Sequence, residues 1–150
     1  MPAMIVDQPE EFTPTIAREG VHRLGPFDVR LAPVEHGECW ASRIGDQLCY
    51  TADSAPCAAL DGLAAGVDVL LAEACGFDAD GPLSGGHSTA GDAGRLAVRS
   101  GVRLLVLTHL RPWHDHVRLL DEAAAIANCP VILARPGLRL AFPSNSDRRP

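Results

Sequence analysis

The chain has 150 residues, of which 47% are hydrophobic and 21% are charged, a balance that predicts one domain with a single core over residues 1–150. Its net charge of −6 argues against binding to bulk DNA, because surfaces that hold nucleic acid are strongly basic. All thirteen basic residues are arginines, and this excludes Schiff-base catalysis and phosphate binding by a P-loop lysine.

The five cysteines lie in apolar surroundings and form no C-x-x-C pair, which is typical of buried, reduced thiols. The first residues lack a basic start followed by an apolar core, and no apolar run reaches membrane-spanning length. We therefore expect a cytoplasmic protein without a membrane anchor. Residues 144–150 are expected to form a flexible tail.

Short strands dominate the first part of the chain. The pattern predicts an edge strand and then three strands in an antiparallel meander, with a turn at Gly45-Asp46. The predicted strands cover residues 12–17, 27–34, 40–44 and 47–52.

Strands and helices alternate in the rest of the chain. Pro56 opens a helix that Gly66 stops, and Thr89 caps a second helix with Asp92 at the capping-box position. The predicted helices cover residues 56–64, 90–100 and 115–128, and the predicted strands cover residues 67–74, 103–110, 131–134 and 138–142. This order indicates an α/β fold, in which functional groups gather at strand ends.

Polar residues follow the apolar segments at the points where an α/β protein places its chemistry. Asp53 ends one predicted strand, His109 ends another and His36 follows a third. His87 stands in a Gly-Gly-His-Ser-Thr loop that leads into a helix. Three histidines and one carboxylate supply the donor atoms that zinc or manganese prefers. No His-x-His-x-Asp-His stretch occurs in the sequence, so we expect these residues to form part of a metal-binding set.

Several segments share one further property, which is that their order and spacing match a known family. They are Val34-Glu35-His36 with Ala41-Ser42-Arg43-Ile44, Tyr50-Thr51-Ala52-Asp53-Ser54, Leu70-Leu71-Ala72-Glu73-Ala74, His87-Ser88-Thr89-Ala90-Gly91-Asp92-Ala93 and Leu105-Val106-Leu107-Thr108-His109-Leu110. Together they resemble successive motifs of the metallo-β-lactamase fold, in its branch of ribonuclease Z-like metallo-hydrolases. The resemblance covers about residues 27–142 and implies the C-terminal half of a four-layer αββα sandwich, with a mixed sheet and helices on one face.

The resemblance also implies a role for each site residue. His36 would bind the first metal ion, Asp53 would bridge two ions, and His109 would bind the second ion. His87 would donate a proton to the leaving oxygen, and Glu73 would orient His87. The implied cofactor is a pair of zinc ions, with manganese as the alternative, and a metal-bound hydroxide would attack a phosphorus or carbonyl centre.

The chain departs from the family pattern at several positions. The family's first two metal ligands and its Asp-His pair have no counterpart in the sequence. Ala52 replaces the usual glycine, Ser54 replaces the commoner threonine, and Gly37 replaces the proline that often follows the third histidine. We expect the isolated chain to be inactive without the missing half, and we expect its bare sheet face to be covered by a second copy in a homodimer or by a complementing N-terminal half.

Structural roles compete with the functional ones. The alternatives are a helix N-cap for Asp53, a core histidine satisfied by the backbone for His109, an ordinary loop residue for His87, and an ion-pair partner of Arg95 or Arg99 for Glu73. The string Trp113-His114-Asp115-His116 predicts a surface cap of the following helix, and Trp40 and Trp113 are expected to pack against the protein rather than to stack on a ligand.

Two functions from different classes follow. The first is a metal-dependent hydrolase that cleaves phosphodiesters or esters in a small-molecule or nucleotide substrate. The alternative is a non-catalytic remnant that acts as a binding or assembly module.

Overall fold

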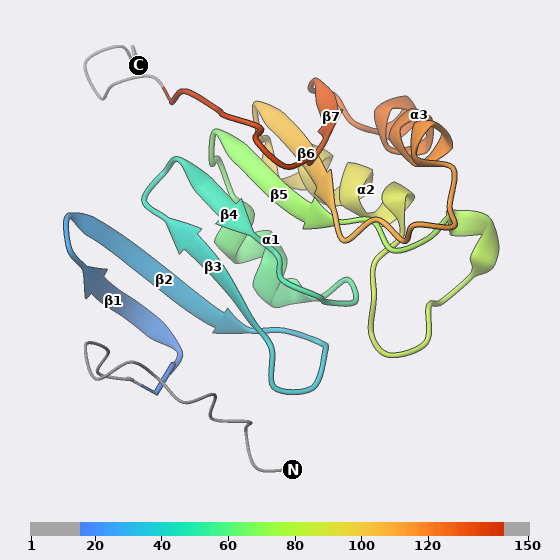
Figure 1. The fold of residues 1–150 in the computed structure, drawn as a ribbon. Coiled ribbons are helices and arrows are strands. Elements are labelled where there is room, and N and C mark those ends of the chain that lie inside the picture. The colour runs from blue at the N-terminus through green and yellow to red at the C-terminus, as the bar shows by residue number, and fades with distance from the viewer. Residues whose placement is uncertain (1–15, 143–150) are drawn as a thin grey trace.

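The computed structural model describes residues 16–142, which form one mixed sheet of seven strands in the order β1 to β7 (Figure 1). The strands are β1 (Gly20–Leu24), β2 (Phe27–Pro33), β3 (Trp40–Ile44), β4 (Leu48–Tyr50), β5 (Val69–Glu73), β6 (Leu104–Thr108) and β7 (Val131–Leu133). The helices are α1 (Ala58–Ala64), α2 (Ala90–Ser100) and α3 (His116–Ile126), with a short 3₁₀ helix at Asp78–Asp80.

The direction of each strand follows from the length of its connection. Short connections of two to six residues join the consecutive strands from β1 to β4, and each of these neighbouring pairs is antiparallel. Longer crossovers that contain helices join the consecutive strands from β4 to β7, and each of these neighbouring pairs is parallel. A parallel neighbour requires a crossover of a dozen or more residues, and a helix usually supplies it. The helices lie on one face of the sheet (Figure 1). The predicted α/β fold, with a mixed sheet and helices on one face, is confirmed.

The core lies between the sheet and its helices. Leu70 and Leu105 of the central strands and Leu119 of α3 are each fully buried, and burying a side chain of this kind stabilises a fold by roughly 1.5–3 kcal/mol. Gly94 brings α2 close to α3, since a Cβ at this position would lie 2.9 Å from the carbonyl oxygen of Ala123. The parallel strands are therefore held by a packed helical layer.

Side chains cap the N-termini of α2 and α3. Thr89 Oγ1 accepts the backbone N–H of Asp92 at 3.0 Å, and Asp92 returns the bond to the backbone N–H of Thr89, so the predicted capping box of α2 is confirmed. Asp115 accepts the N–H groups of Val117 and Arg118. The predicted cap of the last helix is confirmed as well.

One predicted strand is wrong, a second falls mostly outside the described residues, and one strand was missed. Residues 138–142 form no strand, because the chain turns after β7, with Leu138 N–H donating to the Arg135 carbonyl, and does not pair with the sheet again. The strand predicted at residues 12–17 falls mostly outside the described residues, and its last two residues lie in no strand. β1 instead begins at Gly20, where the side chains are mostly exposed. The predicted tail at residues 144–150 also lies outside the described part of the chain.

Within residues 16–142, each helix is too short or too polar to cross a membrane.

Candidate active site

Three parallel strands deliver the first three site residues to one edge of the sheet. Glu73 is the last residue of β5, and His109 follows β6, whose Thr108 pairs with Glu73. Asp53 comes three residues after Tyr50, the end of β4. Because the carboxyl ends of parallel strands meet at the same edge, these side chains lie together.

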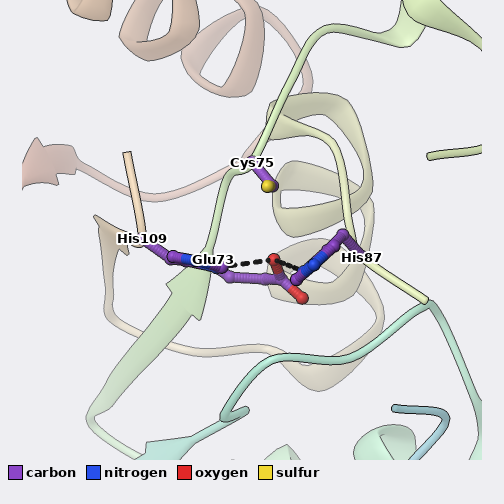
Figure 2. A group of neighbouring side chains, drawn as sticks. All are labelled: Glu73, Cys75, His87 and His109. Carbon is purple, nitrogen blue, oxygen red and sulfur yellow. Dashed lines mark hydrogen bonds and ion pairs between the residues drawn. The ribbon is translucent and has the colours of Figure 1, made fainter. Parts of the chain in front are cut away.

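Glu73 is the centre of the hydrogen-bonding network at this edge. Its side chain is only 2% exposed, and its Oε2 lies 2.9 Å from Nδ1 of His87 and 3.2 Å from Nδ1 of His109 (Figure 2). Its Oε1 accepts the backbone N–H of Ser54. An ionised carboxylate in this position favours a proton on Nδ1 of both imidazoles. Their Nε2 atoms are then available to bind a metal ion or to transfer a proton.

His109 and Ala52 share an unusual backbone conformation. Their φ angles are 54° and 55°, in the left-handed region that costs a residue with a Cβ on the order of 1–3 kcal/mol. Both residues stand where a site strand ends, and the bend turns the chain so that Asp53 Oδ1 comes within 3.2 Å of His109 Nδ1. Glycine adopts the φ seen at Ala52 without this cost.

His36, in the connection between β2 and β3, contacts the loop that leads into α2. Its Nδ1 lies 3.1 Å from the Gly86 carbonyl oxygen, and its ring centre lies 4.6 Å from that of His87. The His87 ring is in turn 5.1 Å from the His109 ring. Ser88 fixes the same loop by donating its hydroxyl to the Ser54 carbonyl at 2.6 Å. The contacts therefore join all five predicted site residues into one continuous group.

Gly86 permits the approach of this loop to the strand end that carries His36. A Cβ at Gly86 would lie 2.3 Å from the Glu35 carbonyl oxygen, whereas a Cβ at Gly85 would meet only the His87 ring, at 3.5 Å. Gly86→Ala is therefore expected to destabilise the protein by about 1–3 kcal/mol more than Gly85→Ala. Both glycines have positive φ, so the backbone cost is shared. Urea unfolding measures the difference, and equal losses in the two variants would show that the close approach is not tight.

Cys75 is a site residue that the sequence analysis missed. Ligand atoms of Glu73, Cys75, His87 and His109 all lie within 4.8 Å of one another (Figure 2). Burial raises the pKa of the Cys75 thiol, and the nearby Arg111 guanidinium opposes this rise by its charge and a hydrogen bond. The available signal was spacing, because Cys75 stands two residues after Glu73 and side chains two apart on extended chain point the same way.

The structural alternatives for Asp53 and Glu73 are wrong. Cys57, not Asp53, is the N-cap of α1. The two arginines proposed as partners of Glu73 pair elsewhere, Arg95 with Asp78 and Asp92, and Arg99 with Asp61.

The structural alternatives for His87 and His109 are wrong as well. Both rings contact carboxylates, so His87 is not an ordinary loop residue and His109 is not a core histidine satisfied by the backbone. Trp113, expected to pack, is 74% exposed.

An open cleft of about 590 Å³ adjoins the site. Pro56, His87, Thr89 and Arg95 lie in its wall. His87 thus borders both the carboxylate network and a space large enough for a small substrate.

The donor atoms at the site suit a divalent metal ion. Imidazole nitrogens, carboxylate oxygens and a thiol sulfur are the ligands that zinc takes in proteins, and here they come from four strand ends and one loop. The Nδ1 atom of His109 contacts two carboxylates, an arrangement that orients an imidazole for a metal.

Comparison with known proteins found relatives but no matching family model. The chain is 36% identical over 119 residues to the probable metallo-hydrolase YhfI of Bacillus subtilis. This match covers 75% of the present chain and 48% of YhfI. The chain is also 34% identical over 116 residues to ribonuclease Z of Thermobifida fusca. That match covers 74% of the present chain and 36% of the ribonuclease. The chain thus spans between about a third and a half of the length of these curated relatives.

Solved structures show the same relationship. The crystal structure of the metallo-β-lactamase fold protein YhfI matches with a TM-score of 0.75 and 30% identity, over 79% of this chain and 51% of YhfI. The short form of human tRNase Z shares the fold, with a TM-score of 0.58 and 21% identity, over 82% of this chain and 46% of that one. The chain therefore belongs to the metallo-hydrolases of the metallo-β-lactamase fold, in their ribonuclease Z-like branch.

Proposed function

We propose that this chain is the C-terminal half of a metal-dependent hydrolase that cleaves phosphodiesters, with carboxylic esters as the second substrate class. One observation carries the proposal: the buried Glu73 carboxylate holds His87 and His109 at 2.9 and 3.2 Å, beside Asp53. The names of relatives such as ribonuclease Z favour phosphodiesters over esters.

In this proposal His36, Asp53 and His109 hold zinc, with manganese as the alternative. Divalent ions at such a site polarise a phosphoryl oxygen and lower the pKa of water. Asp53 would contribute carboxylate oxygens to this site, since its side chain is 35% exposed and its Oδ1 lies 3.2 Å from His109 Nδ1.

His87 is the proposed proton donor to the leaving oxygen. Its Nδ1 is engaged by Glu73, so the proton that reaches substrate comes from Nε2. The ring is only 13% exposed and borders the 590 Å³ cleft. Glu73 is therefore proposed as a positioning residue that fixes the ring through its Nδ1.

The remaining ligands are proposed to come from a complementing first half, in a longer chain or a second polypeptide. The sequence holds no His-x-His-x-Asp-His stretch, and the curated relatives are two to three times longer than their matched segments. Co-expression with the first half of Bacillus subtilis YhfI, followed by an assay on bis(p-nitrophenyl) phosphate, tests this. Hydrolysis that depends on His87 supports the enzyme. A stable complex that binds metal without any hydrolysis would favour the non-catalytic remnant.

Metal retention by the isolated chain gives a separate prediction. Because His36, Asp53 and His109 alone are too few ligands for two ions, the chain is expected to bind zinc weakly and to lose it on dialysis. Elemental analysis after dialysis measures the remaining zinc. Two equivalents per chain would show that the residues present complete both sites.

A homodimer of the isolated chain is also proposed. Cys49 and Leu70 face the helices, so their neighbours Tyr50 and Leu71, which pair across β4 and β5, face the other side of the sheet. A second copy would cover this face through a self-complementary contact. Light scattering is expected to give twice the 15.9 kDa chain mass, and a monomer at all concentrations would contradict the proposal.

A cytoplasmic location is proposed as well. Its support is that all five cysteines, each within the described residues, are free thiols, as is usual in a reducing compartment.

A further inference from the structure

The loop after His109 presents an exposed tryptophan on a fixed backbone. Trp113 is 74% exposed, although the loop around it is well anchored. The Arg111 carbonyl accepts the backbone N–H of His114 at 3.1 Å and contacts His116 Nε2 at 2.9 Å. Asp115 then caps α3. An indole held in solvent by an ordered loop is typical of a contact surface, because burying it elsewhere would be favourable.

Arg111 connects this tryptophan to the active site. Arg111 stands two residues after His109, in the segment that leaves β6, and His109 belongs to the cluster with Glu73, Cys75 and His87. The guanidinium carbon of Arg111 lies 5.8 Å from the centre of the Trp113 ring. Along the chain, a cation therefore stands between a residue of the ligand cluster and an exposed aromatic ring.

A second pair of an aromatic ring and a cation, Phe77 and Arg118, is linked to Trp113 through His114. The His114 ring lies 6.2 Å from Trp113 and meets Phe77 edge to face at 5.2 Å. Arg118 lies over the Phe77 ring at 5.1 Å. Contacts therefore join two arginines and three aromatic rings into one group, in a chain whose net charge is −6.

We propose that Trp113 stacks on the nucleobase of a nucleotide substrate while Arg111 pairs with its phosphate. The inference rests on the proposed phosphodiesterase function and names the substrate side that carries a base. The Arg111 guanidinium attracts an anion such as a phosphate. The neighbouring Trp113 ring, which contacts Arg111, offers a flat π-surface on which a base can stack. A nucleotide combines both groups at this spacing. The acidic protein as a whole favours a single nucleotide or a strand end over a long nucleic acid.

Tryptophan fluorescence tests the stacking without any hydrolysis. The protein has two tryptophans, so Trp40→Phe leaves Trp113 as the reporter and Trp113→Phe leaves Trp40. Adenosine 5′-monophosphate is expected to quench the Trp40→Phe variant in a saturable manner and to leave Trp113→Phe nearly unchanged. Ribose 5-phosphate, which has the phosphate but no base, should quench neither. Absence of saturable quenching in Trp40→Phe, or equal quenching in both variants, would overturn the proposal.

Hydrolysis by the complemented enzyme supplies the second arm. Thymidine 5′-(p-nitrophenyl phosphate) and methyl p-nitrophenyl phosphate share a leaving group and differ in the nucleoside. Trp113→Ala is expected to raise KM for the thymidine substrate by about 10–100-fold, the range that base stacking gives, and to leave KM for the methyl substrate unchanged. Arg111→Gln should raise KM for both.

The outcomes separate the two proposals. A wild-type complex that hydrolyses neither substrate, together with saturable quenching of the Trp40→Phe variant by the nucleotide, would contradict the phosphodiesterase and keep the base site. Equal KM increases on the two substrates in Trp113→Ala would show that the indole only supports the loop, and binding of a protein in place of the nucleotide would assign the surface to a partner. Either result overturns base stacking.

Discussion

Replacing His87 with alanine in the complemented enzyme is expected to lower the rate of hydrolysis by about 10²–10⁴-fold while the metal content stays unchanged. The reason is the division of contacts around Glu73: His87 Nδ1 is held by its carboxylate at 2.9 Å, and the ring borders the cleft. The rate of bis(p-nitrophenyl) phosphate hydrolysis and the metal bound per complex are measured on the same sample.

Matched variants make this result specific. Asp53→Ala and His109→Ala are expected to lose metal and rate together, because these residues hold the ion in the proposed site. His22→Ala is the control, since His22 lies on β1 and its Nε2 contacts the Arg18 carbonyl at 2.7 Å. Loss of metal in His87→Ala as well would place the ion within the cluster of Glu73, Cys75, His87 and His109 and would reject the role of His87 as a proton donor only.

Glu73→Gln is expected to reduce the free energy of unfolding by about 1–3 kcal/mol. Both carboxylate oxygens are used, Oε1 by Ser54 N–H and Oε2 by His87 and His109. An amide offers one acceptor in place of two, and a buried donor that loses its partner costs about 1–3 kcal/mol. The loss is measured by urea unfolding of the isolated chain.

Glu122→Gln is the matched control for this substitution. The Glu122 carboxylate accepts from Asp78 N–H and Gly91 N–H through the same oxygen, Oε1, which an amide oxygen can replace. Its stability is expected to change by less than about 0.5 kcal/mol. A Glu73→Gln variant as stable as the wild type would mean that the two imidazoles shift their protons to Nε2 and accept from the amide.

The meeting of Asp53, Glu73 and His109 could be predicted from sequence because it follows from one rule. Each residue closes an apolar strand, and parallel strands bring their carboxyl ends to one edge. The loop that carries His87 was recognised from the family resemblance, but its contact with His36 through Gly86 depends on a close approach to Glu35 that no pattern along the chain records.

The errors have a common physical origin. β1 pairs with β2 through backbone hydrogen bonds while its side chains remain mostly exposed, so it carries no apolar alternation. Residues 138–142 carry that alternation, but the pattern does not tell whether a free strand edge is within reach. The exposure of Trp113 likewise depends on how the loop is anchored at Arg111, which residue type alone does not reveal.

The order of the strands bears on how the site forms during synthesis. Every strand of the sheet pairs only with its neighbours in the sequence, so a chain emerging from the ribosome can extend the sheet at one growing edge without reopening earlier pairs. Asp53 and Glu73 are in place as soon as β5 has docked, whereas His109 arrives only with β6. Until β6 docks, the Glu73 carboxylate lacks its contact with His109, so a growing chain cannot present Asp53 and His109 together to free metal.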